Sequence, residues 1–111
     1  MREISIGATP TAGSSTTLYT VPTGYRGLWN LSYIHNTSGS TKHITLQWYD
    51  ASANSTYDIL FQYNVASKDY LKLDGGSYVV LEEGDQIKCT PETGSTYTVI
   101  LTIELMGNQR T

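Results

Sequence analysis

The chain has 111 residues and a net charge of −3, and its seven Lys and Arg residues are spread singly along the sequence. This distribution argues against a nucleic-acid partner, which requires a concentrated basic face. The length predicts one domain over residues 1–111. No run of about 18 apolar residues could span a membrane, and one cysteine cannot form an intramolecular disulfide.

Apolar and polar residues alternate along most of the chain, with the period of two that is typical of strands. Gly, Pro and Asn turn signals separate the runs, and no window shows sustained helical spacing. The pattern predicts an all-β fold: a single antiparallel β-sandwich, jelly-roll-like, of about eight to nine short strands. We expect the strands at residues 2–6, 15–20, 26–36, 42–50, 57–65, 68–73, 77–82, 85–90 and 96–106.

In two of these runs, the question is which residues face the core. The run 26–36 places Trp29 and Tyr33 on one face and Ile34 on the other, so both faces are apolar. Either the outer face meets a sheet edge or another chain, or a bulge after Gly27 shifts the phase. In the run 57–65 the pattern predicts one buried set, made up of Tyr57, Ile59, Phe61, Tyr63 and Val65.

The stretch LEEGDQIK at 81–88 gathers three carboxylates around one glycine. Paired carboxylates can carry out acid–base chemistry, but they need burial or a close partner to separate their pKa values. Apolar residues end at Leu81 and resume at Ile87, which predicts a hairpin turn whose tip is solvated. We therefore expect no catalytic site here.

Other candidate sites are equally weak. His35 and His43 flank one turn and could face each other on paired strands, but a third metal ligand is not evident. The segment 50–54 places oxygen side chains at alternate positions, yet it lacks the central Gly and closing Glu of a calcium loop. Cys89 is in phase with Ile87 and is expected in the core. We predict no catalytic residue, no cofactor and no metal.

Three phrases carry a resemblance: TTLYTVPTGYRG at 16–27, YIHNTSGSTKHITLQW at 33–48 and YVVLEEGDQIKCT at 78–90. Their order resembles a group of small virion proteins of tailed bacteriophages, over about residues 16–105. That group includes capsid-decorating (cement) proteins, tail accessory proteins and fibre segments. The resemblance implies a structural role in the virion and no catalysis, and it carries over no site residues.

On this basis we expect a non-enzymatic capsid decoration protein that binds and stabilises the major capsid protein shell or other virion subunits. We expect a homo-oligomer, with a trimer favoured, located in the virion. The first ten residues lack the basic start and apolar run of a signal peptide, so we expect synthesis in the host bacterial cytoplasm.

Nine tyrosines against one phenylalanine suit β-sheet surfaces and protein interfaces alike. The candidate interface residues are Tyr25, Trp29, Tyr33, Tyr49, Glu82, Glu83 and Asp85. The alternative function is a tail, fibre or head-to-tail accessory protein, in which exposed aromatics such as Trp29, Trp48, Tyr25 and Tyr49 stack on host glycans. An enzyme ranks third, with the three carboxylates as its best site.

Overall fold

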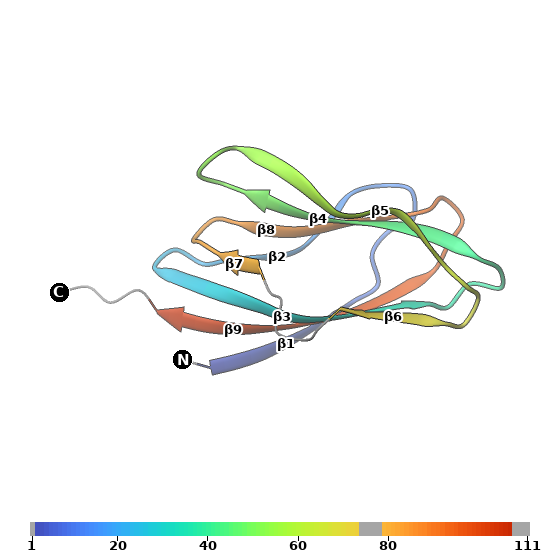
Figure 1. The fold of residues 1–111 in the computed structure, drawn as a ribbon, viewed down its shortest axis with the longest axis horizontal. Coiled ribbons are helices and arrows are strands. Elements are labelled where there is room, and N and C mark those ends of the chain that lie inside the picture. The colour runs from blue at the N-terminus through green and yellow to red at the C-terminus, as the bar shows by residue number, and fades with distance from the viewer. Residues whose placement is uncertain (1, 74–78, 108–111) are drawn as a thin grey trace.

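The computed structural model describes residues 2–73 and 79–107, and every regular element among them is a β-strand (Figure 1). The all-β prediction is confirmed, and observed strand ends differ from the expected ones by no more than two residues. The expected turn at 74–77 and the start of the run 77–82 fall outside the described residues. The strands are β1 (Arg2–Ala8), β2 (Thr16–Thr20), β3 (Tyr25–Asn36), β4 (Lys42–Asp50), β5 (Ser55–Val65), β6 (Tyr70–Leu73), β7 (Val79–Leu81), β8 (Gln86–Pro91) and β9 (Tyr97–Gly107).

The strands form two antiparallel sheets. Sheet A has the order β1-β9-β3-β6, with β7 also paired to β3, and sheet B has the order β2-β8-β4-β5. Strand β7 pairs with the first part of β3 and β6 with its last part, so the two occupy one edge position. Counted as one strand, they give two sheets of four whose strands alternate along the chain except at the β4–β5 hairpin, which is the jelly-roll arrangement.

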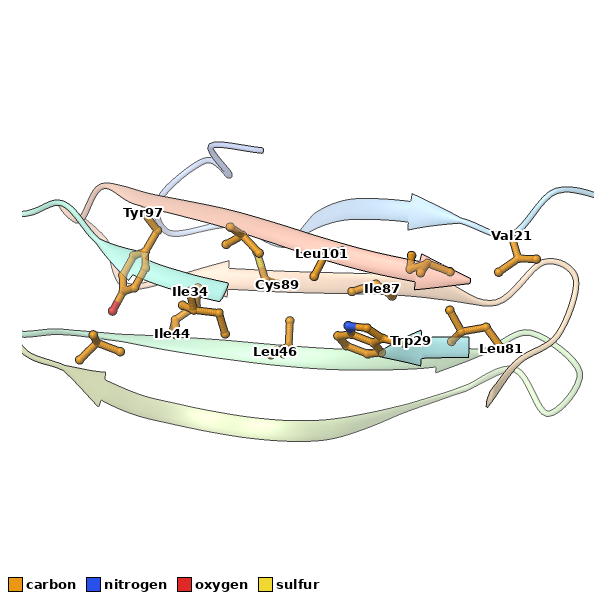
Figure 2. Close-up of a cluster of buried hydrophobic side chains, with 13 residues drawn as sticks. Val21, Trp29, Ile34, Ile44, Leu46, Leu81, Ile87, Cys89, Tyr97 and Leu101 are labelled. Atoms are coloured by element: carbon orange, nitrogen blue, oxygen red, sulfur yellow. The ribbon is translucent and has the colours of Figure 1, made fainter. Parts of the chain in front are cut away.

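The core lies between the two sheets (Figure 2). Alternate residues of β8 and β9 are buried because successive strand residues point to opposite faces, as the period of two predicted. Burial of apolar area in this layer supplies the main driving force for folding. Its buried members are Val21, Trp29, Ile34, Ile44, Leu46, Val65, Leu81, Ile87, Cys89, Tyr97, Val99, Leu101 and Ile103.

Strand β3 contains the bulge that one reading of its sequence anticipated. Its register with β9 shifts between Trp29 and Leu31. The extra residue reverses the phase, so Trp29 and Ile34 are both buried although an odd number of positions separates them. The prediction that Tyr33 shares a face with Trp29 is therefore wrong.

Strand β5 departs most from its predicted burial. Val65 is buried, but Tyr57, Ile59, Phe61 and Tyr63 are 37–69% exposed. Two causes combine: β5 is the edge strand of sheet B, and its register with β4 shifts twice. The register shifts place Leu60, and not Phe61, opposite the buried Leu46 and against the core, so the set that periodicity predicted does not share one face.

Candidate functional site

The outer faces of the two sheets differ in chemistry, which locates the surface most suited to a partner. Residues directly opposite on neighbouring strands share a face. On the central strands of sheet B the outer pairs are Thr45 with Thr90 and Gln47 with Lys88, so this part of the face is polar, and the exposed apolar residues of sheet B lie on its edge strand β5. On the same face, the Lys88 Nζ lies over the Tyr49 ring, 5.1 Å from its centre, and so covers part of this aromatic residue.

The outer face of sheet A carries exposed and half-buried apolar residues on β3, β6, β7 and β9, beside polar pairs such as Glu3 with Glu104 and Ser5 with Thr102. Tyr33 lies opposite Ile100 of β9, and Leu28 lies opposite Val80 of β7. Tyr70, Val80 and Ile100 are 59%, 45% and 40% exposed. An exposed apolar cluster bordered by polar residues is typical of an interaction surface. We call the set Leu28, Tyr33, Tyr70, Val80 and Ile100 the sheet A patch.

A shallow depression opens at one end of the sheet A patch. It is lined by Tyr33, His35, Tyr70, Thr98 and Ile100. The Tyr33 and Tyr70 rings are 6.0 Å apart at an interplanar angle of 53°, and the Lys72 Nζ lies 5.9 Å from the Tyr33 ring centre. The tilted rings and the nearby cation lie in the distance range of favourable aromatic and cation–π contacts. The depression thus combines aromatic area with polar groups at its rim.

The aromatic residues predicted from the sequence do not form one site. Tyr33 belongs to the sheet A patch, Tyr25 is exposed at the start of β3, and Tyr49 lies on sheet B, where its hydroxyl donates to the Asn54 Oδ1. Trp29 is buried, and its indole N–H donates to the Ser32 hydroxyl at 2.8 Å. Trp29 is therefore a core residue, which removes it from both the interface and the glycan-stacking predictions.

The three carboxylates of the acidic turn between β7 and β8 differ in burial. Gly84 adopts a positive φ of 85°, as expected of the turn, and Glu82 and Glu83 are exposed. Asp85 is only 1% exposed, so the prediction of a solvated tip is wrong for this residue. Its carboxylate accepts hydrogen bonds from Trp48 Nε1, Ala51 N and Glu82 N at 3.2, 2.9 and 3.0 Å.

These bonds explain why Asp85 is buried. The turn packs against the turn that joins β4 to β5, and the carboxylate satisfies donors from both. A buried carboxylate needs such partners because an unpaired one is costly. Asp85 has a structural role and is unavailable to a partner protein.

In the part of the chain that the structure describes, no three His, Cys, Asp or Glu residues form a cluster that could hold a metal ion. His35 and His43 lie in opposite sheets, because β3 and β4 do not pair. The expectation that they could face each other on paired strands is therefore wrong. The core position predicted for Cys89 is confirmed, and burial raises its pKa to about 12, which suppresses the reactive thiolate.

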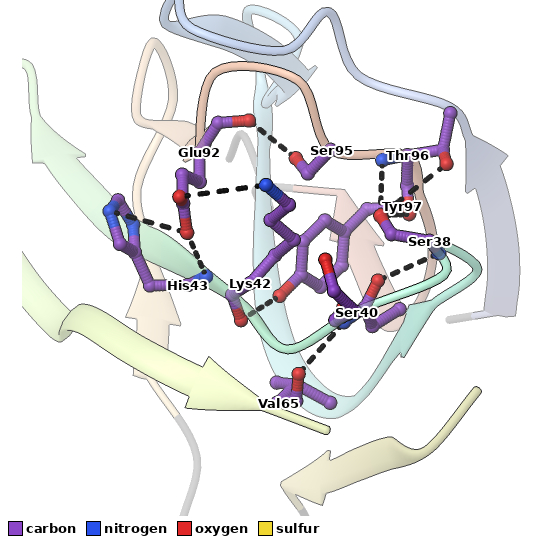
Figure 3. A network of polar contacts seen from close by, with 10 residues as sticks. Ser38, Ser40, Lys42, His43, Val65, Glu92, Ser95, Thr96 and Tyr97 are labelled. Carbon is purple, nitrogen blue, oxygen red and sulfur yellow. Dashed lines mark hydrogen bonds and ion pairs between the residues drawn. The ribbon is translucent and has the colours of Figure 1, made fainter. Parts of the chain in front are cut away.

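One polar network remains, at the end of the sandwich opposite the acidic turn (Figure 3). Glu92 accepts from the His43 backbone N–H at 2.9 Å, and its other oxygen lies 3.8 Å from the Lys42 Nζ. The Tyr97 hydroxyl donates to the Lys42 carbonyl at 2.7 Å. Desolvation, with a smaller contribution from Glu92, raises the pKa of Tyr97 to about 12. These contacts tie backbone segments together.

Sequence reasoning missed Tyr70, Ile100 and Val80 as surface residues of one patch. The signal for Ile100 was present, since it lies between Thr98 and Thr102 on the outward phase of the last strand. Assigning all three to one surface also required the strand order, because β6, β7 and β9 are separated in sequence and meet only through β3.

Comparison with known proteins finds no matching family model and no match among curated proteins. Among the described residues, no helix could cross a membrane.

Proposed function

We propose that the protein is a non-enzymatic structural protein of a tailed-phage virion, and that it decorates the capsid by docking the sheet A patch onto the major capsid protein or another virion subunit. The observation that carries the proposal is the exposed apolar cluster on the outer face of sheet A, whereas the central strands β4 and β8 of sheet B pair polar residues on their outer face. The proposed site of synthesis is the cytoplasm of the bacterial host.

Two further features support this proposal. The three phage-like phrases span residues 16–48 and 78–90, which include strands of both sheets. A jelly roll also suits an adhesive role, because its rigid double layer holds surface side chains in fixed positions. Many copies on a symmetric shell would multiply a weak contact into high avidity.

Co-sedimentation with emptied, expanded capsids tests the proposal. The double variant Tyr70→Ser, Ile100→Thr removes exposed apolar area from the sheet A patch without touching a core residue. We expect it to weaken capsid binding at least about tenfold, since aromatic anchors dominate interface energies. The matched control is Tyr49→Ser on sheet B, which should bind as the parent does. Absence of capsid binding by the parent protein, or equal losses in both variants, would overturn the proposal.

The depression beside Tyr33 and Tyr70 supports a second candidate, a tail or fibre protein that contacts host glycan. The exposed ring of Tyr70 and the half-buried ring of Tyr33 offer apolar faces for sugar C–H groups, while His35 and Thr98 offer polar atoms for hydroxyls. A glycan array distinguishes the two functions. Binding that Tyr70→Ser abolishes would favour the glycan role, and a blank array combined with tight capsid binding would eliminate it.

A further inference from the structure

The edges of the two sheets are unequally protected. An edge strand exposes unpaired backbone N–H and C=O groups, and proteins usually shorten it, place Lys or Pro on it, or twist it with a bulge, which is the one device that β5 has. In the described part of the chain, the edge strands β6 and β7 have four and three residues, β2 has five, and β1 has seven and begins with Arg2. Strand β5 has eleven residues, contains no Lys, Arg or Pro, and pairs with β4 alone among the described strands.

The side chains of β5 add apolar area to this open edge. Phe61 is 69% exposed, which is the highest value among the large exposed apolar residues, and Tyr57 and Tyr63 are 50% and 46% exposed. The only charge on the strand is Asp58, and the Gln47 side chain donates to it at 2.9 Å. Such an edge is a template for pairing with another strand.

The shape and charge of β5 favour a second copy of the chain as the occupant. The two register shifts with β4 and the positive φ of Gln62 give the edge an added local twist. A second copy related by a two-fold axis presents a β5 edge with the same twist at symmetric positions. A straight strand would not follow the twisted edge of β5 along its length. In an antiparallel pairing centred near Phe61, Asp58 lies opposite Asn64 of the other copy, so like charges do not oppose each other.

The flanking charges agree with this orientation. On the neighbouring strand β4, His43 lies opposite Asn64 and Lys42 opposite Val65. The antiparallel arrangement therefore brings the Asp58 end of one copy toward the Lys42 end of the other, although Glu92 offsets part of that positive charge.

We infer that the protein forms a homodimer in which the β5 strands of two copies pair antiparallel about a two-fold axis near Phe61, joining two B sheets into one eight-stranded sheet. A trimer needs a heterologous contact between two different surfaces, whereas β5 offers a self-complementary one. The inference does not depend on the virion role, because it concerns the free protein and leaves the sheet A patch open.

Single cysteine substitutions test the axis directly. Residues at a two-fold axis meet their own copies, and directly opposite residues of antiparallel strands have Cα atoms within disulfide range. We expect one variant among Ile59→Cys, Phe61→Cys and Tyr63→Cys to give a covalent dimer on mild oxidation. Tyr70→Cys, equally exposed but on sheet A, is the control and should stay monomeric under denaturing conditions. Cys89 does not interfere because it is buried.

Light scattering and hydrogen exchange measure the free protein. We expect Phe61→Lys to raise the dimer dissociation constant at least about tenfold, while Tyr70→Lys leaves it unchanged. Amide protection of β5 should increase with protein concentration, and that of β2 should not. A monomer at every concentration, a trimer, or a dimer whose β5 amides stay unprotected would each overturn the inference.

Discussion

The two ends of the sandwich hold their buried polar groups in different ways. At one end, a single carboxylate, Asp85, accepts three hydrogen bonds, two from turns and one from the Trp48 side chain of β4. At the other end, the bonds are shared among several residues. There Asn36 donates to Ser40 and Val65, the Ser38 hydroxyl accepts from Thr96, and Tyr97 donates to Lys42 (Figure 3).

The difference concerns how each end tolerates change. Loss of one member of a shared network leaves most of the other bonds in place, whereas loss of a single central acceptor leaves all of its donors unsatisfied. The Asp85 end should therefore depend most on one charged residue, whereas at the other end, where the neutral Asn36 makes three side-chain bonds, loss of an outlying member such as Tyr97 should cost less.

The largest effect is expected for Asp85→Ala. It leaves the donors of Trp48, Ala51 and Glu82 without their acceptor, and bonds to a charged group are worth more than neutral ones. We expect the free energy of unfolding to fall by at least about 3 kcal/mol, measured by urea denaturation. Glu83→Ala on the same turn is the control and should change it by less than about 0.5 kcal/mol. A cost for Asp85→Ala as small as that of the control would refute the central role.

A smaller effect is expected for Tyr97→Phe, which removes one bond from the shared network. At pH 7 the free energy of unfolding should fall by about 1 kcal/mol. The pKa of Tyr97 is raised to about 12 in the folded protein, so its neutral form stabilises the fold fully below the ordinary Tyr pKa of about 10. That contribution is lost as the pH rises from about 10 to about 12.

The pH dependence provides the control for this variant. The advantage of the parent over Tyr97→Phe should shrink between pH 10 and pH 12, and denaturation at pH 7 and pH 11 measures it. Both proteins should also lose stability above about pH 9, since both retain Cys89, whose pKa rises from 9.0 to about 12 on folding. A constant difference across this range would contradict the assigned pKa direction for Tyr97.

The smallest effect is expected for the double variant Glu82→Lys, Glu83→Lys. Both side chains are exposed, so thermal unfolding should follow that of the parent within about 0.5 kcal/mol. A loss above about 1 kcal/mol would place these glutamates in the hydrogen-bonding system of Asp85 and would weaken the contrast between the two ends. Adding Asp85→Lys to the double variant should prevent folding.

The sequence predicted much of the fold, because strand period and turn chemistry are local properties. The bounds of β4 were predicted without error, and the core positions of Cys89 and Leu101 followed from phase alone. These residues lie in strands that are flanked on both sides by others, where the inward phase is necessarily covered.

The failures have non-local causes. Phe61 was assigned to the core because phase cannot show that β5 is an edge strand. Asp85 was assigned to solvent because a turn sequence does not reveal that a second turn packs over it. Tyr33 was placed beside Trp29 because a bulge reverses the phase between them. Each error concerns what lies next to a strand or turn, which depends on the packing of distant segments.

The position of β9 has a consequence for synthesis of the protein. This strand lies between β1 and β3 in sheet A and supplies Val99, Leu101 and Ile103 to the core, yet it is the last of the nine strands to emerge from the ribosome. Until it emerges, β1 lacks its partner strand and the inner face of β8 remains uncovered. The core can therefore close only after the whole span from β1 to β9 has been translated, and the nascent chain needs protection from aggregation until then.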